Sequence, residues 1–297
     1  MTSRKFKKAR WETFKVLGFL FLVVVFGSFY YYQKTFPTQV LSVQSVAPIP
    51  VNKNLEFPIV SAKYIFIIDR ASKMVLYQKE ANKKIYPAST TKMMSAIVAL
   101  EHYPLTQMIQ VNRPFPEGQN LGLVSGDRLS MQQLLYGLLV YSANDSAEVL
   151  AENYPGGRAS FIAAMNDKAK EWGAMDTHFT NPSGLDEEGH YSTAVDLLKI
   201  ADFAMKYADF SKIVGTETAV LDSGNGHNLM ILKNVNELLG KVPGVMGVKT
   251  GFTTGAGQSL ISLVGREGHE VLFAVLGSND RFGDTKKIIE WVYANFY

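Results

Sequence analysis

The apolar residues of this chain follow different patterns in different parts of the sequence. Near the N-terminus, Val16 to Gln33 form a largely apolar stretch of eighteen residues without a charge. Short runs rich in β-branched and aromatic residues, which are typical of strands, appear at 64–69 and 74–77. Such runs return only near the C-terminus, and they span 245–250, 259–264 and 271–276. These five runs are the predicted strands.

Longer apolar patterns predict helices through the middle of the chain and at its end. The expected helices span 90–100, 131–141, 145–153, 158–172, 193–207 and about 284 to the C-terminus. Ser130 and Gln133 form a capping-box pattern before the second of these helices. Strands at both ends with helices between them predict an α+β fold, in which one antiparallel sheet carries helices on both faces. A parallel doubly wound sheet would need strands that alternate regularly with helices, and the middle of the chain lacks them.

The pattern of the N-terminal region predicts a membrane anchor. Residues 1–15 carry a net charge of +5, and the apolar stretch 16–33 that follows is close to the roughly 20 residues that cross a bilayer as a helix. Basic residues stay on the cytoplasmic side, so everything after Lys34 should lie outside the cytoplasm. The alternative is a cleaved signal peptide, whose nearest small-x-small site, 45–47, lies well downstream. Both interpretations export the rest of the chain, and we favour an uncleaved single-pass signal-anchor.

The exported part divides into a linker and one domain. Residues 34–60 contain four prolines and no clear period, which predicts a flexible linker. The domain is expected at 61–297, where the strand and helix patterns lie. The chain has no cysteine, which excludes disulfides, thiolate catalysis and cysteine metal sites. Residues 16–297 sum to a charge of −2, so the basic body of a nucleic-acid-binding protein is absent.

Ser89 and Lys92 are the first candidates for catalysis. They lie three residues apart at the start of an apolar helix, so their side chains share one face. Burial in that helix and nearby cations would lower the pKa of Lys92 towards neutrality, and the neutral amine could take the proton of Ser89 as it attacks a carbonyl. Taken alone, the pair could equally be a helix-capping serine followed by an exposed lysine.

A second polar pair, Ser142 and Asn144, falls in the predicted loop between two helices. A loop is a good place to present polar groups to a cleft, where the hydroxyl could relay a proton and the amide could hold a substrate backbone. This pattern is weak by itself, because capping of the next helix explains it as well. The same pattern recurs at 223–225, where we expect a turn.

The run Lys249, Thr250 and Gly251 ends an apolar strand and occurs once. Lysine suits a carboxylate, threonine adds a hydroxyl, and glycine lets a ligand approach the backbone. A strand that simply ends at a glycine turn is the structural alternative. The three motifs together, in this order and on these element types, are far less expected by chance than any one of them.

In combination these motifs closely resemble those of the serine-type D-Ala-D-Ala carboxypeptidases, the low-molecular-weight penicillin-binding proteins. The resemblance covers about 61–297 and includes three longer segments. They are 87–94 around the first serine, 181–185 with 190–197, and 247–253 with 256–257. It implies a β-lactamase/transpeptidase-like fold, with the active site where sheet and helices meet.

The resemblance also implies a role for each residue. Ser89 would be the nucleophile, Lys92 its base, Ser142 a proton relay and Asn144 a substrate-orienting group. Substrate binding would fall to Lys249, Thr250, Gly251 and Phe252. Of these, Lys249 and Thr250 would hold the terminal carboxylate of a peptidoglycan stem peptide. The backbone N–H groups of Ser89 and Phe252 would form the oxyanion hole. His190 and Asp196 match the family pattern too, and we expect them to have structural roles. No metal or cofactor is implied, and β-lactams would acylate Ser89 as covalent inhibitors.

Three alternatives remain open at this level. Relatives that lack a second β-rich domain include D,D-endopeptidases, which cut crosslinks, and the chain ends about 46 residues after Gly251, which leaves no room for such a domain. A class A-like β-lactamase shares the three motifs, but its Glu-x-x-Leu-Asn string does not occur here. A catalytically inactive wall-binding module is disfavoured because Ser89, Lys92 and Lys249 are all present.

Overall fold

The computed structural model describes residues 3–35, 49–222 and 229–297, which belong to two compact units, Met1–Val46 and Ala47–Tyr297. The first unit contains helix α1 (Ser3–Thr35). Within α1 the segment Phe14–Tyr32 is long and apolar enough to cross a membrane. The predicted turn at 223–225 and most of the first half of the predicted linker lie outside the described residues.

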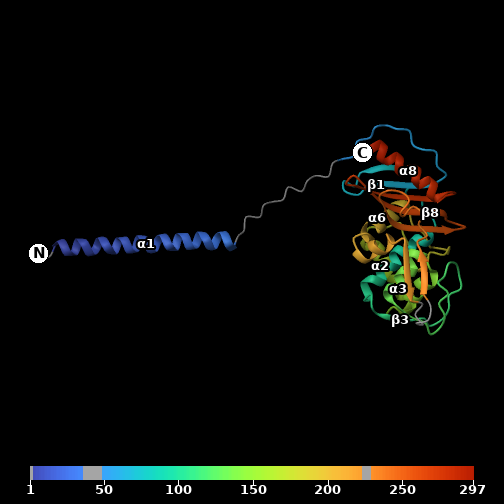
Figure 1. Cartoon of the computed structure of the whole chain (residues 1–297), viewed down its shortest axis with the longest axis horizontal. Helices are drawn as coiled ribbons and strands as arrows, with labels where there is room; N and C mark the ends of the chain where they lie inside the picture. The colour runs from blue at the N-terminus through green and yellow to red at the C-terminus, as the bar shows by residue number, and fades with distance from the viewer. Residues whose placement is uncertain (1–2, 36–48, 223–228) are drawn as a thin grey trace. The chain divides into compact units, whose positions relative to one another are not determined.

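The second unit contains the remaining helices and strands (Figure 1). Its strands are β1 (Tyr64–Asp69), β2 (Val75–Lys79), β3 (Met108–Gln110), β4 (Arg128–Ser130), β5 (Thr218–Asp222), β6 (Leu229–Lys233), β7 (Val245–Thr253), β8 (Gly257–Arg266) and β9 (His269–Ser278). Its helices are η1 (Ala88–Thr91), α2 (Lys92–His102), α3 (Met131–Tyr136), η2 (Gly137–Tyr141), α4 (Asn144–Asn153), α5 (Gly157–Glu171), α6 (Ala194–Ala204), α7 (Ala208–Val214) and α8 (Arg281–Phe296).

One five-stranded antiparallel sheet organises this unit. The strand order is β2-β1-β9-β8-β7, so an early strand, β1, lies beside the last strand, β9. The two chain-end regions therefore pair, as strand signals at both ends of the sequence predict. Strand β7, which carries the Lys249 motif, is at one edge of the sheet.

Helices cover both faces of this sheet, which confirms the predicted fold class. Alternate residues of β9 enter two separate apolar cores, because successive side chains of a strand point to opposite faces. Phe273 and Val275 pack with α8 on one face, whereas Leu272 and Ala274 pack with α2, α6 and the other helices on the opposite face. Figure 1 shows α8 on one side of the sheet and the larger helical layer on the other.

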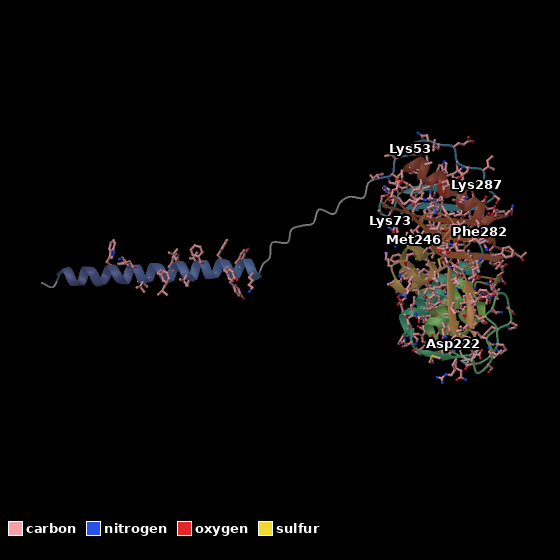
Figure 2. The ribbon with its side chains drawn as sticks, in the orientation of Figure 1. Lys53, Lys73, Asp222, Met246, Phe282 and Lys287 are labelled. Atoms are coloured by element: carbon pink, nitrogen blue, oxygen red, sulfur yellow. The ribbon has the colours of Figure 1, made fainter. Side chains whose placement is uncertain are left out.

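The folded unit begins before the predicted boundary at residue 61. The backbone N–H of Val51 donates to Phe296 O, and Lys53 Nζ donates to Ala294 O at 3.1 Å (Figure 2). The ring of Phe57 stacks on Tyr77 with 3.7 Å between centroids. Residues 51–60 are thus an extended segment that packs on α8. Such a segment has no helical or strand period, so the sequence pattern reads as a linker.

Several smaller elements also differ from the expected pattern. The capping box of Ser130 and Gln133 is confirmed, but the helix it opens changes at Gly137 from α3 to the π-helical turn η2. Helix α7 and the hairpins β3–β4 and β5–β6 were not predicted. Each of these elements is short, and its stability depends on packing against the rest of the domain rather than on its own pattern.

Candidate active site

A cleft of about 650 Å³ opens where η1, the loop after η2 and strand β7 meet. Elements far apart in the sequence line it. The lining residues are Ser89, Gly118, Gln119, Ser142, Asn144, Ser183, Gly184, Leu185, Val235, Glu237, Thr250, Gly251, Phe252, Thr253, Gln258, Arg281 and Phe282. Six of the eight residues predicted for the site, Ser89, Ser142, Asn144, Thr250, Gly251 and Phe252, are among them.

Lys92 lies directly behind the cleft wall. It is the first residue of α2, it is fully buried, and its Nζ is 2.9 Å from Ser89 Oγ. Nζ also donates to Asn144 Oδ1 and to the backbone oxygen of Ser183, each at 2.6 Å. Since the amide oxygen and the backbone carbonyl can only accept, these two bonds hold the amine in place whether it is charged or neutral.

Burial lowers the pKa of Lys92 from 10.5 to about 7. The carboxylates of Glu148 and Asp145 act in the opposite direction and raise it. The expected direction of the pKa shift is therefore found, and burial is its cause as expected. The neighbouring charges that act on Lys92 are carboxylates and not the cations that were also expected. An amine with this pKa is available as a base at neutral pH.

Ser142 and Asn144 form the second wall. Ser142 follows η2 in the left-handed backbone conformation, with φ 66°, and this turn places its hydroxyl in the cleft. Asn144 Nδ2 donates to the backbone oxygen of Glu117 at 2.9 Å, while its Oδ1 accepts from Lys92. The amide is therefore fixed in orientation, and it links the Lys92 amine to the loop over the cleft.

Lys249 lies on β7 and is also buried, with 1% of its surface exposed. Its Nζ donates to Ser142 Oγ at 2.8 Å and to Thr250 O at 3.1 Å. Burial lowers the pKa of Lys249 well below its usual value, and the charges of Lys92 and Arg281 lower it further. Lys249 does not itself line the cleft, so it reaches a ligand there most directly through the hydroxyl of Ser142.

Gly251 allows β7 to run close to η1, the segment that contains Ser89. A Cβ at this position would lie 3.1 Å from the Cβ of Ala88 and 3.3 Å from the backbone nitrogen of Ser89. Any larger residue would push the strand away from η1. The next residue, Phe252, also lines the cleft and has 62% of its surface exposed.

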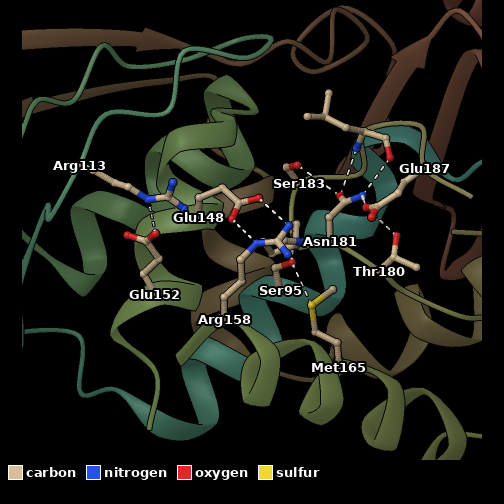
Figure 3. A network of polar contacts seen from close by, with 12 residues as sticks. Ser95, Arg113, Glu148, Glu152, Arg158, Met165, Thr180, Asn181, Ser183 and Glu187 are labelled. Carbon is tan, nitrogen blue, oxygen red and sulfur yellow. Dashed lines mark hydrogen bonds and ion pairs between the residues drawn. The ribbon is translucent and has the colours of Figure 1, made fainter. Parts of the chain in front are cut away.

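The segment 181–185 supports the site from below. Asn181 Oδ1 accepts hydrogen bonds from the N–H groups of Gly184 and Leu185, and its Nδ2 donates to Glu187 (Figure 3). Gly184 has φ 89°, and a Cβ there would lie only 1.9 Å from the backbone oxygen of Ala88. The loop therefore needs glycine in order to pack beneath η1 and to present Ser183 O to Lys92.

His190 has the structural role expected from the sequence. It is 1% exposed, and burial lowers its pKa to about 4. Its Nδ1 accepts from the backbone N–H of Thr180, so Nε2 carries the proton and faces Thr91 Oγ1 at 2.9 Å. Neutral His190 thus joins the loop that contains Thr180 to Thr91 in η1. Asp196 similarly accepts from the backbone N–H of Asp176 at 2.7 Å.

Two functional positions were missed by sequence reasoning. Arg281, the first residue of α8, lines the cleft, and its Nη1 donates to Gly251 O at 3.1 Å. Asp145 accepts from the backbone N–H groups of Leu121, Gly122 and Leu123 and so holds the loop over the cleft. Only the adjacency of Asp145 to Asn144 could have indicated its role, and nothing local marks Arg281.

Comparison with known proteins identifies relatives across most of the chain. The sequence profile of a family described as D-alanyl-D-alanine carboxypeptidase matches residues 51–280. D-alanyl-D-alanine carboxypeptidase DacB2 of Mycobacterium tuberculosis is 35% identical over 238 residues, which are 77% of this chain and 81% of that protein. DacF of Bacillus subtilis, also a D-alanyl-D-alanine carboxypeptidase, is 30% identical over 79% of this chain, which spans 63% of the length of DacF. The Streptomyces K15 DD-transpeptidase structure aligns with a TM-score of 0.75 and 31% identity, covering 81% of this chain and all of that one.

Proposed function

The chain belongs to the family of D-alanyl-D-alanine carboxypeptidases, and on that premise we propose that it removes the terminal D-Ala from peptidoglycan stem pentapeptides through an acyl-enzyme on Ser89. The observation that carries this proposal is the surroundings of the Lys92 amine. A neutral amine has two N–H donors and one lone pair. Asn144 Oδ1 and Ser183 O take the two donors, so the lone pair is directed at Ser89 Oγ, 2.9 Å away.

The reaction begins when Lys92 takes the proton of Ser89. Ser89 Oγ then attacks the carbonyl carbon of the penultimate D-Ala, and the developing negative charge is stabilised by the backbone N–H groups of Ser89 and Phe252. The close approach of Gly251 to the Ser89 nitrogen supports this pairing, because it brings the two backbone segments together. The C–N bond breaks, and the free D-Ala leaves.

The terminal carboxylate of the substrate is held beside strand β7 and the start of α8. Thr250 and Arg281 line the cleft and offer a hydroxyl and a guanidinium to it. Lys249 lies behind them and acts through Ser142 Oγ, which it contacts at 2.8 Å. The proton that Lys92 took from Ser89 then passes through Ser142 to the leaving nitrogen, and Lys249 holds the Ser142 hydroxyl in place for that step.

Water completes the cycle by hydrolysing the ester on Ser89. β-Lactams carry a strained amide and a carboxylate in a similar relation, so they acylate Ser89 in the same way. Their carboxylate meets the same threonine and guanidinium. They are therefore expected to be covalent inhibitors whose release is slow, in contrast to turnover by a β-lactamase.

We also propose that the N-terminal helix is an uncleaved anchor with its basic end in the cytoplasm. The apolar segment Phe14–Tyr32 and the basic residues before it support this topology. The catalytic unit then acts outside the cytoplasmic membrane, where peptidoglycan lies. A protease-protection assay on membrane vesicles tests the orientation.

The test of the function is mass spectrometry of monomeric pentapeptide muropeptides after incubation with the full-length protein in detergent. The expected result is the loss of one alanine, blocked by prior labelling with fluorescent penicillin at Ser89. Penicillin labelling without any trimming would contradict the proposed activity. Rapid turnover of the penicillin label would favour a β-lactamase.

A further inference from the structure

A cavity of about 380 Å³, which we call the α4 cavity, adjoins the cleft at the start of α4. Asn144, Ser183 and Leu185 line both spaces, so the cleft and the α4 cavity share a wall. Asn144 Oδ1 and Ser183 O are also the acceptors that hold the Lys92 amine. The shared wall therefore contains two of the three partners of Lys92.

An ion pair between Glu148 and Arg158 forms another part of the α4 cavity. Glu148 lies one turn after Asn144 on the same face of α4, and Arg158 is the second residue of α5. Arg158 Nε donates to Glu148 Oε2 at 2.8 Å, and Nη2 donates to Oε1 at 3.4 Å (Figure 3). Only 12% of the Glu148 side chain is exposed, so water screens its charge weakly.

The charged groups around the Lys92 amine come from α4 and β7. Glu148 and Asp145, both on α4, raise the pKa of Lys92, and Glu148 has the larger effect. The buried amine of Lys249 on β7 also interacts with Lys92. Asp145 accepts hydrogen bonds from neutral backbone N–H groups at 121–123, whereas Glu148 is paired with a cation. The negative charge that Glu148 presents to Lys92 therefore depends on Arg158.

This dependence has a chemical consequence. A lone carboxylate beside a buried amine stabilises the ammonium form and would keep Lys92 protonated at neutral pH. A guanidinium bound to that carboxylate opposes the effect. Glu148 raises the pKa of Arg158 above its usual value, so the guanidinium stays charged at every pH at which the enzyme works. The pair is thus a fixed unit with no net charge.

The next turn of α4 carries a similar ion pair. Glu152 accepts from Arg113 Nε at 2.6 Å, as Glu148 does from Arg158 (Figure 3). Glu152 lies two turns from Asn144, and 63% of the Arg113 side chain is exposed. The two pairs share the same chemistry and the same helix, but they differ in distance from Asn144, so one is a matched control for the other.

We propose that Glu148 and Arg158 are positioning residues for the reaction, which act through Asn144 and Lys92 and set the pH above which Lys92 is a base. This rests on the proposed function, in which Lys92 takes the proton of Ser89. Arg158 withholds part of the Glu148 charge from the resting amine. The remaining negative charge stabilises the ammonium that forms on Lys92 when Ser89 attacks.

The test measures acylation of the full-length protein in detergent by a fluorescent penicillin from pH 5 to 9. Arg158→Gln leaves the Glu148 carboxylate without its cation, so the midpoint of the rise in rate should move up by roughly one pH unit. The rate at pH 6 should then fall about tenfold, whereas the rate at pH 9 should hardly change. Arg158→Lys keeps the cation and should keep the midpoint of the unmodified protein.

Two further variants separate charge from structure. Glu148→Gln keeps the shape of the side chain but leaves Arg158 without its anion, so the midpoint should move down by roughly one pH unit. The double variant Glu148→Gln/Arg158→Gln removes both charges and should return the midpoint to that of the unmodified protein. Opposite shifts that cancel are the signature of a charge effect, because structural damage would accumulate instead.

The matched control is Arg113→Gln, which removes the cation from the Glu152 pair and should leave the midpoint unchanged. An unchanged midpoint in Arg158→Gln, or an equal shift in the control, would overturn the inference. So would a loss of rate at pH 9 that the double variant does not reverse, since the pair would then serve only the structure. An unmodified protein whose rate does not rise with pH would instead refute the proposed role of Lys92.

Discussion

The cleft lies between a helical wall, where Lys92 begins α2, and a strand wall, where Lys249 lies on β7. Each wall buries its lysine, but the surroundings of the two lysines differ. On the helical wall, the Lys92 amine has three partners, and the carboxylates of Asp145 and Glu148 partly offset its burial. On the strand wall, Lys249 has two partners, and the nearby charges that act on it are the cations Lys92 and Arg281. The charges that act on Lys249 are therefore positive, whereas those that act on Lys92 are negative.

This difference supports the different tasks that we propose for the two lysines. An amine with a full set of partners and a pKa near neutrality is prepared to exchange a proton. On the strand wall, Lys249 and Arg281 lie together and are prepared to receive a carboxylate, which the substrate brings with it. A ligand with a terminal carboxylate therefore adds negative charge where Lys249 has only cationic neighbours.

The largest effect is expected from Lys92→Met, which removes the base and keeps the apolar stem. Acylation of Ser89 by pentapeptide and by penicillin should both fall by about 10³- to 10⁴-fold, because general-base catalysis contributes on that scale. Stopped-flow acylation with a fluorescent penicillin measures it. Ser89→Ala and the double variant Ser89→Ala/Lys92→Met should lose as much activity as Lys92→Met, because the effects of residues that act as one unit are not additive. A Lys92→Met protein that acylates normally would remove the distinction between the two walls.

Lys249→Met should have a smaller effect that depends on the substrate carboxylate. We expect kcat/KM for the pentapeptide to fall by roughly 10²-fold, because a charge beside the carboxylate site and the leaving group is lost. A pentapeptide that ends in an amide should react slowly with the unmodified protein and lose little more in the variant. Equal losses for acid and amide substrates would show that Lys249 does not serve carboxylate recognition.

The sequence predicted the helical wall better than the strand wall. The juxtaposition of Ser89 and Lys92 follows from their spacing on one helix, so a local pattern was sufficient. The contact between Lys249 and Ser142 joins residues 107 positions apart and depends on the left-handed turn at Ser142, which no local pattern indicates. Arg281 was missed for the same reason, because only the sheet brings the start of α8 to Gly251.

The fold shows the same division between local and long-range information. Strand runs at both chain ends were enough to predict an antiparallel sheet with helices on both faces. The extended segment 51–60 and the hairpin β5–β6 were not predicted, because each is held by packing on other elements and has little pattern of its own. A cavity beside the cleft is bounded partly by that hairpin, so no local pattern could predict it either.

The pH dependence of acylation can sharpen the comparison between the walls. The rate should rise with pH through about 7, since Lys92 must lose its proton to act as a base and burial lowers its pKa to about 7. In Lys249→Met the midpoint should stay near 7, because burial and not a neighbouring cation lowers the pKa of Lys92. Penicillin acylation from pH 5 to 9 measures both curves. A midpoint that moves to higher pH in the variant would show that Lys249 also contributes to the shift.

The smallest effect is on stability, and it tests the protonation of Lys92 independently of catalysis. Its pKa is about 7 in the folded protein against 10.5 for the unperturbed lysine, so between these values the unfolded chain binds more protons and stability rises with pH. Lys92→Met lacks this contribution. The difference in unfolding free energy between the unmodified protein and the variant should therefore increase by about 1 kcal/mol per pH unit from pH 7.5 to 9.5 and stay flat below pH 6.5. The hydrogen bonds lost in the variant add a constant offset, so the slope is the readout.

Urea unfolding followed by the fluorescence of Trp172 and Trp291 measures this slope, with Lys287→Met as the control on the surface. A flat difference across this range would mean that buried Lys92 keeps its proton, and the helical wall would then hold a cation and not a base.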